Sequence, residues 1–85
     1  MSDIPSLNEA RSALERAHRA ALAMDGSALR RALEEARERL GEIAEESQVQ
    51  AARDKVAQAL ADLDGGSLDE MERLLERARA DLAGA

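Results

Sequence analysis

Glu15 and His18 are the residues of this sequence whose types and spacing could do chemistry. In a helical Glu-x-x-His motif the carboxylate and the imidazole lie on adjacent turns, where they can ligate iron, as in di-iron four-helix sites. Such a site needs two of these motifs and two further glutamates. His18 is the single histidine, so a second chain would have to supply the other motif. Glu15 also points about 100° away from the apolar Leu14, which favours a surface ion-pairing role.

The other patterns that could carry catalysis are incomplete. A serine nucleophile needs a base within hydrogen-bond reach, and His18 is the only imidazole. Gly65-Gly66 is not followed by the Lys-Ser/Thr of a phosphate-binding loop. Cysteine is absent, which excludes disulfides and thiolate metal sites. The sequence therefore predicts no catalytic residue, no cofactor-binding residue, no metal ligand and no cofactor, and we expect that the protein is not an enzyme.

Composition and charge exclude further classes of function. The chain has no Phe, Trp or Tyr, and nucleic-acid platforms that stack bases on aromatic rings need them. A net charge of −6 disfavours binding to DNA phosphates. No apolar run approaches the roughly 18 residues of a membrane span, and the first residues lack the apolar region of a signal peptide. We expect a soluble, cytoplasmic protein that binds neither nucleic acid nor membranes.

The common residues are strong helix formers. Nineteen Ala and twelve Leu, together with Glu and Arg, dominate the 85 residues, and β-branched residues number only four. The sequence predicts an all-α fold, a small helical bundle of tandem antiparallel αα-hairpins in one domain, 1–85. Its expected parts are a flexible N-terminus at 1–5 and helices near 6–24, 27–46, 48–63 and 67–83.

Start and stop signals support these boundaries. Residues 6–9 and 67–70 both read Ser-Leu-x-Glu, which fits a capping box at the start of a helix. Gly26 suits the left-handed position that ends a helix, and Ser27 suits the cap of the next one. Two helices joined by so short a turn must lie antiparallel.

Apolar residues recur at spacings of three and four, the heptad pattern of amphipathic helices and coiled coils. In the first helix they are Leu7, Ala10, Leu14, Ala17, Ala21 and Met24. The second helix also offers intrahelical charge pairs at i,i+4: Arg30 with Glu34, Arg31 with Glu35, and Glu35 with Arg39. The predicted core comprises Leu7, Leu14, Ala17, Ala21, Leu29, Leu33, Ala36, Leu40, Ile43, Val56, Leu60, Leu63, Met71, Leu75 and Leu82.

The middle of the chain allows two interpretations. After Ile43 the apolar stripe moves to the opposite helix face and resumes at Val49. A break near Ser47, where a third capping box fits, gives four helices. Alternatively, one helix runs from residue 27 to residue 63, with Gly41 tolerated inside it at about 1 kcal/mol. In that case each hairpin leaves an apolar stripe that only a second chain can cover.

Internal similarity also has two explanations. Residues 6–17 align with 67–78, and residues 31–37 align with 73–79. Tandem hairpins would produce such similarity, and so would shared compositional bias, since amphipathic helices drawn from a few residue types align easily.

The expected function is that of a non-catalytic helical scaffold or protein-interaction module. Capping boxes, short turns and dense charge pairs are typical of a designed bundle. The alternative is a natural bacterial or phage protein that binds another protein through a helical surface, because eleven Arg to one Lys is typical of GC-rich genomes. A dimeric di-iron carboxylate protein built on Glu15 and His18 is a third possibility. The large aliphatic residues are few for a stable monomer, so we expect a homodimer.

Overall fold

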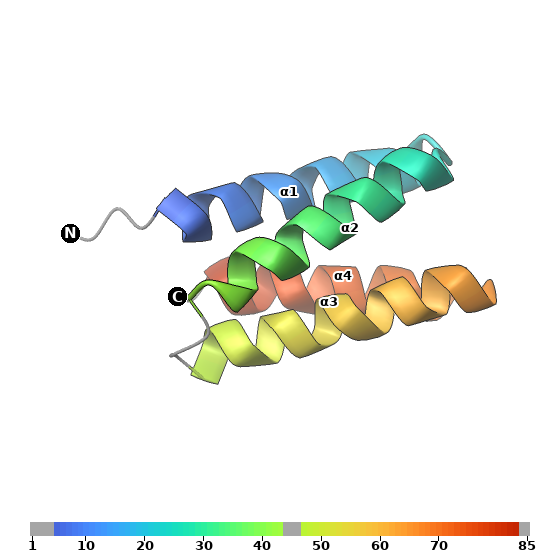
Figure 1. Cartoon of the computed structure of the whole chain (residues 1–85). Coiled ribbons are helices and arrows are strands. Elements are labelled where there is room, and N and C mark those ends of the chain that lie inside the picture. Colours follow the sequence, from blue (N-terminus) through green and yellow to red (C-terminus); the bar gives the residue numbers. More distant parts are fainter. Residues whose placement is uncertain (1–4, 44–46, 84–85) are drawn as a thin grey trace.

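The chain folds into four α-helices, seen here in a computed structural model that describes residues 5–43 and 47–83. Figure 1 shows α1 at Pro5–Leu22, α2 at Gly26–Gly41, α3 at Ser47–Gly65 and α4 at Leu68–Ala83. Successive helices run in opposite directions, so the predicted all-α bundle of antiparallel hairpins is confirmed. The predicted boundaries agree with these helices to within a few residues, and the predicted helix 27–46 extends past the end of α2 into the turn at 42–43.

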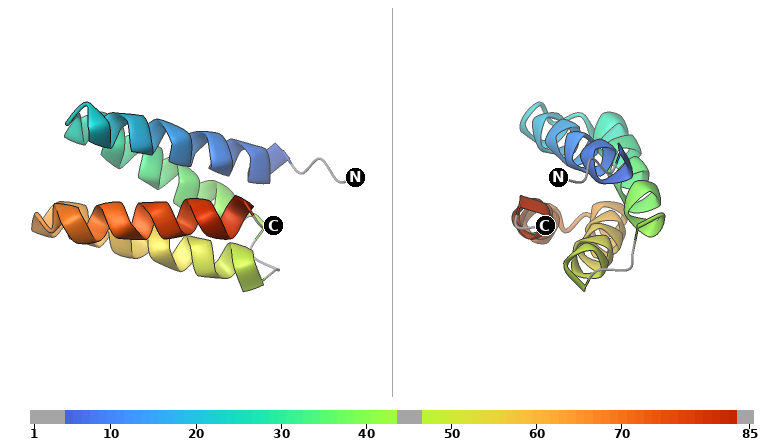
Figure 2. Two further views of the ribbon diagram at one scale, coloured as in Figure 1. Left: turned by 180° about the vertical axis from the view of Figure 1, so that it is seen from behind. Right: turned by 90° about the vertical axis from the view of Figure 1, so that its left-hand side faces the viewer.

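The helices form a ring in chain order. α1 packs on α2, α2 on α3, α3 on α4, and α4 returns to α1, with the last pair in less extensive contact than α2 and α3. Both hairpin turns lie at one end of the bundle (Figure 2). The end of α2 and the start of α3 lie at the other end, beside the first residues of α1 and the last residues of α4.

The break in the middle of the chain is present, so the single long helix is wrong. α2 ends at Gly41, and residues 42–43 form a turn in which the backbone N–H of Ile43 donates to the carbonyl of Leu40 at 3.2 Å. Gly41 therefore ends a helix instead of lying inside one. The break lets the two opposite apolar stripes face one core. Residues 44–46, the end of the predicted helix 27–46, lie outside the described residues.

The two hairpin turns share one hydrogen-bond pattern, a Schellman motif. In the first, the N–H of Met24 donates to Ala21 at 3.1 Å and that of Asp25 to Ala20 at 2.9 Å. In the second, Gly66 donates to Leu63 at 3.3 Å and Ser67 to Asp62 at 2.8 Å. The left-handed residues are Met24, with φ 57°, and Gly66, with φ 81°.

The residue that follows each left-handed position caps the next helix. Asp25 is the N-cap of α2, and its carboxylate accepts from the N–H of Ala28 at 3.2 Å. The predicted roles of Gly26 and Ser27 are therefore wrong, because the turn comes earlier and both residues lie within α2. Ser67 immediately precedes α4 and its carbonyl accepts from the N–H of Met71 at 3.0 Å, in agreement with its predicted position.

The first helix starts earlier than predicted. α1 begins at Pro5, and proline suits the first helical position because the N–H that it lacks has no partner there. Ser6 lies inside the helix and its hydroxyl donates to the carboxylate of Glu42 at 2.7 Å. The capping box at 6–9 is therefore wrong. Of the predicted N-terminus 1–5, residues 1–4 lie outside the described part of the chain.

One hydrophobic core joins the four helices. The predicted core residues are buried except Leu7, Ala21, Ile43 and Leu63, which are partly buried against the core near helix ends. The buried residues that the prediction missed are mostly small: Ala10, Ala13, Ala20, Ala32, Val49, Ala52, Ala59, Leu74 and Ala78. Alanine at so many core positions lets the helices approach closely.

The two hairpins are built alike. The five buried residues of α2 correspond to the five of α4 at a constant separation of 42 residues: Leu29 and Met71, Ala32 and Leu74, Leu33 and Leu75, Ala36 and Ala78, Leu40 and Leu82. Met24 and Gly66 share this separation. The similarity of 31–37 to 73–79 thus joins equivalent helices, whereas that of 6–17 to 67–78 joins α1 with α4, which occupy different places in their hairpins.

Ion pairs connect each helix to its neighbours around the ring. Three residues of the predicted intrahelical pairs bind other helices instead: Arg30 pairs with Asp64, Glu35 with Arg16, and Arg39 with Glu9 at 2.8 Å. Lys55 pairs with Asp81 between α3 and α4, and Arg79 with Glu15 between α4 and α1. Long side chains beside the core stripe reach the adjacent helix, so the intrahelical arrangement is wrong.

Candidate functional site

The structure places Glu15 in an ion pair. Its carboxylate oxygen accepts from Nε of Arg79 at 3.1 Å and from Nη2 at 2.6 Å. This hydrogen bonding lowers the pKa of Glu15. His18 lies on the same helix and is half-buried. Within the described residues, no three His, Cys, Asp or Glu side chains gather where they could hold a metal ion. Glu15 thus links α1 to α4, and no further ligands accompany it and His18 there.

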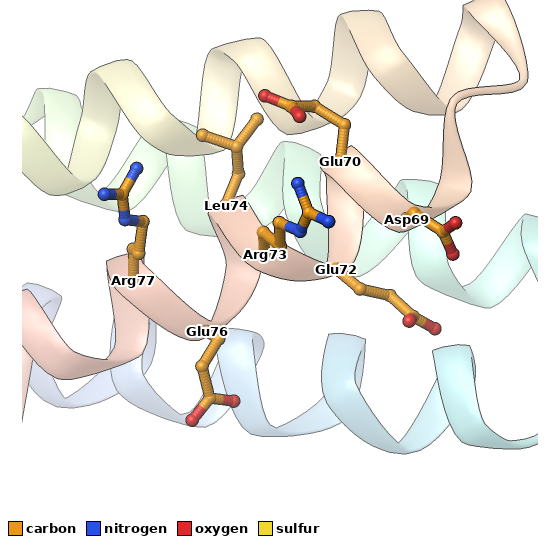
Figure 3. A pocket seen from close by; sticks show the side chains of 7 residues that line it. All are labelled: Asp69, Glu70, Glu72, Arg73, Leu74, Glu76 and Arg77. Carbon is orange, nitrogen blue, oxygen red and sulfur yellow. The ribbon is translucent and has the colours of Figure 1, made fainter.

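A shallow depression runs along the outer face of α4. Figure 3 shows the side chains that line it: Asp69, Glu70, Glu72, Arg73, Leu74, Glu76 and Arg77. All seven belong to one helix and spread to its different sides instead of converging on one point. Such a surface cannot enclose a substrate, and its charges are those of a solvated helix face.

The large apolar side chains that remain exposed in the described residues lie at one end of the bundle. They are Leu22, Met24 and Leu68, with exposed fractions of 73%, 89% and 51%. All three lie at or beside the hairpin turns. We call the surface formed by residues 22–30 and 62–72 the turn end.

A pocket of about 200 Å³ opens at the turn end between the two hairpins. Met24 and Leu68 lie on its wall. The other lining residues are mostly apolar or small: Ala20, Ala21, Asp25, Gly26, Leu29, Leu63, Met71 and Glu72.

Leu22 does not line this pocket but lies at the same end of the bundle. The carbonyl of Leu82 accepts from Arg11 at 2.9 Å, and Glu15 pairs with Arg79 one turn further along α1. Continuing this antiparallel register along the two helices brings Leu22 level with Glu72, a residue of the pocket wall.

The turn end is also strongly acidic. Its sequence contains one basic residue, Arg30, and six acidic residues: Asp25, Asp62, Asp64, Asp69, Glu70 and Glu72. Arg30 pairs with Asp64 across the two hairpins, and its hydrogen bond lowers the pKa of that carboxyl. The helix dipoles oppose one another here, because each turn joins the negative end of one helix to the positive end of the next. The acidic side chains therefore set the sign of the local charge.

Sequence reasoning did not find this surface. Met24 was expected to end the apolar stripe of helix 6–24, but α1 ends at Leu22 and Met24 occupies the turn. Leu22 and Leu68 were assigned to no site. Their signal is present in the sequence, since Leu22 lies off the stripe of its helix and both leucines lie next to turn residues. What the sequence lacked was the arrangement that brings the two turns together.

Fold and surface together define this protein as a small all-α bundle of four helices with an apolar, acid-rimmed end. Comparisons of the chain with protein-family models, with curated proteins and with solved structures gave no significant match. Of the described helices, none is long and apolar enough to cross a membrane.

Proposed function

We propose that this protein is a non-catalytic interaction module that binds another protein through the turn end. Single exposed hydrophobic residues are ordinary on protein surfaces. Here Leu22, Met24 and Leu68 are the large apolar side chains left exposed in the described residues. All three lie at one end of the bundle, and two of them, Met24 and Leu68, line one pocket. A contiguous apolar surface with a polar rim is typical of a protein-binding site.

The conformation of Met24 is the observation that carries the proposal. An L-residue in the left-handed region costs about 1–2 kcal/mol relative to the right-handed one. Gly66, which has no such cost, occupies the equivalent position of the other turn. The methionine side chain is 89% exposed, so packing does not offset the cost. A strained, exposed and adaptable side chain supports a role in binding.

Met24 also bears on whether the protein is natural or designed. Designed bundles place glycine at left-handed turn positions, and Met24 departs from that rule. This observation favours the alternative of a natural helical protein that binds a partner, with the cytoplasm as its expected location. The absence of a catalytic role is part of the proposal, and the ion pair of Glu15 with Arg79 supports it.

Self-association has less support than the sequence suggested. The expected homodimer depended partly on a continuous middle helix with an uncovered stripe, whereas the four helices cover their stripes within one chain. Two turn ends would also repel each other, because both are acidic. We therefore propose a monomer whose partner is a different protein.

A peptide selection tests this function. A phage-displayed library of random peptides is panned against the wild type, and the enriched peptides are then tested against the double variant Met24→Gly/Leu68→Gln. We expect enriched peptides that bind the wild type and lose binding to the variant, whose helicity is checked by circular dichroism. Enrichment of only those peptides that bind both proteins equally, or no enrichment, would contradict the proposal.

A further inference from the structure

The pocket at the turn end has room for a single large side chain. Its volume of about 200 Å³ lies below the roughly 300–1,000 Å³ of sites for small-molecule ligands. Leu29, Leu63 and Met71 supply most of the apolar wall. An aromatic or long aliphatic side chain therefore suits this pocket. Met24 and Leu68 also line it, and the flexible, unbranched side chain of Met24 can adapt to the shape of the inserted residue.

The charged rim determines what can flank that side chain. Glu72 lines the pocket, and Asp69 and Glu70 are exposed in the first turn of α4. None of these three forms an ion pair with another described residue, whereas Arg30, the one base of the turn end, is engaged by Asp64. Cationic groups beside the apolar side chain would meet unneutralised carboxylates, and anionic groups would be repelled.

We infer that the partner inserts one large apolar side chain, flanked by lysines or arginines, from a short segment into the turn end. This inference rests on the proposed function and specifies its partner. A second copy of the chain does not fit, because its own turn end carries the same sign of charge. The bundle is only 19 × 18 Å across, on the order of 350 Å², against roughly 800 Å² per partner in a stable protein–protein interface. An end of this size matches a short segment.

A fluorescent peptide tests the inference. The probe is a seven-residue peptide with tryptophan at its centre and two lysines on each side, separated from it by glycines. All tryptophan emission comes from the probe, because the protein has no aromatic residue. We expect saturable binding to the full chain, weakened at least about tenfold by Met24→Gly/Leu68→Gln. Raising the salt from about 0.05 to 0.5 M should weaken it further.

Matched variants isolate the acidic rim. Glu72→Arg changes the charge at the pocket, and Glu38→Arg makes the same change on an exposed face of α2 away from the turn end. We expect the first to weaken binding severalfold more than the second. Equal effects of the two variants would overturn the role of the rim.

Two further peptides decide between outcomes. If glutamates replace the lysines and the peptide binds as well as the probe, the inferred partner chemistry is wrong. The same conclusion follows if alanine replaces tryptophan and the peptide competes as well as the probe, or if the probe itself does not bind. In each case the proposed function would still be supported if the library selection yields peptides that bind the wild type and not the Met24→Gly/Leu68→Gln variant. Failure of that selection would remove the function as well.

Discussion

Met24 and Gly66 occupy the same position in two copies of one turn, and only Met24 places a side chain there. Each is the left-handed residue of a Schellman motif, with φ 57° and 81°, and each precedes the residue that caps the next helix. The second turn thus shows that glycine is compatible with this backbone. The methionine side chain can therefore be removed without disturbing the turn.

Met24→Gly should stabilise the protein. Glycine relieves the left-handed cost of about 1–2 kcal/mol, partly offset by its greater freedom in the unfolded chain, about 0.5–1 kcal/mol. We expect the free energy of unfolding to rise by about 0.5–1 kcal/mol, measured by urea denaturation followed by circular dichroism. The matched control is Gly66→Met, which should lower it. A Met24→Gly variant less stable than wild type would mean that the side chain contributes to packing.

Enlarging the small core residues should destabilise the bundle. Ala17 of α1 and Ala36 of α2 have no exposed surface, so leucine at either position must displace a neighbouring helix. We expect Ala17→Leu and Ala36→Leu each to lower the free energy of unfolding by about 1–3 kcal/mol. Ala57→Leu, on an exposed face of α3, should change it by less than about 0.5 kcal/mol. A core variant more stable than wild type would argue against close packing.

Acid should weaken the fold through its hydrogen-bonded carboxylates. Hydrogen bonds from Arg79, Ser6 and Arg30 lower the pKa values of Glu15, Glu42 and Asp64, respectively. A carboxyl whose native pKa is lowered stabilises the fold above its unfolded pKa, about 4. That stabilisation is lost as the pH falls through the lowered native value.

Thermal melts between about pH 7 and pH 2.5 measure this loss of stability, which occurs as the pH falls below the ordinary carboxyl pKa of about 4. The variant Glu15→Gln cannot titrate at that position, so its Tm should fall less steeply over the acid range than that of the wild type. Parallel profiles for the two proteins would show that the contact with Arg79 contributes nothing to the pH dependence.

The chain should be monomeric. Since the helices cover one another's apolar stripes, light scattering coupled to size exclusion should give a mass near 9.2 kDa at tens of micromolar. Concentration is read by refractive index, because the chain has no aromatic chromophore. A mass twice as large would restore the homodimer expected from the sequence.

The helices were predictable because their determinants are local. The spacing of Leu29, Leu33 and Leu40 defines a buried face within one helix, and Ser67 signals the start of α4 wherever the helix packs. The shift of the stripe after Ile43 was compatible with a break or with one long helix paired with a second chain, and only the packing of both stripes on one core decides for the break.

The surface chemistry was less predictable because it depends on distant residues. Arg30 has Glu34 within reach along its own helix and Asp64 across the bundle, and only the packing of α2 on α3 decides between them. The position of Met24 depended on where the first turn begins. Both Asp25 and Ser27 are suitable N-cap residues for the second helix, so the sequence did not decide between an earlier and a later turn. The turn end, assembled from two such turns, could not be found before both were placed.

The most direct test of the central claim is an amide ¹H–¹⁵N chemical-shift titration of the wild-type protein with the tryptophan–lysine peptide. If the turn end is the binding surface, saturable shift changes should be confined to residues 20–30 and 62–72. Saturable changes along the outer face of α4 beyond Arg73, or the absence of saturable changes at the turn end, would contradict it.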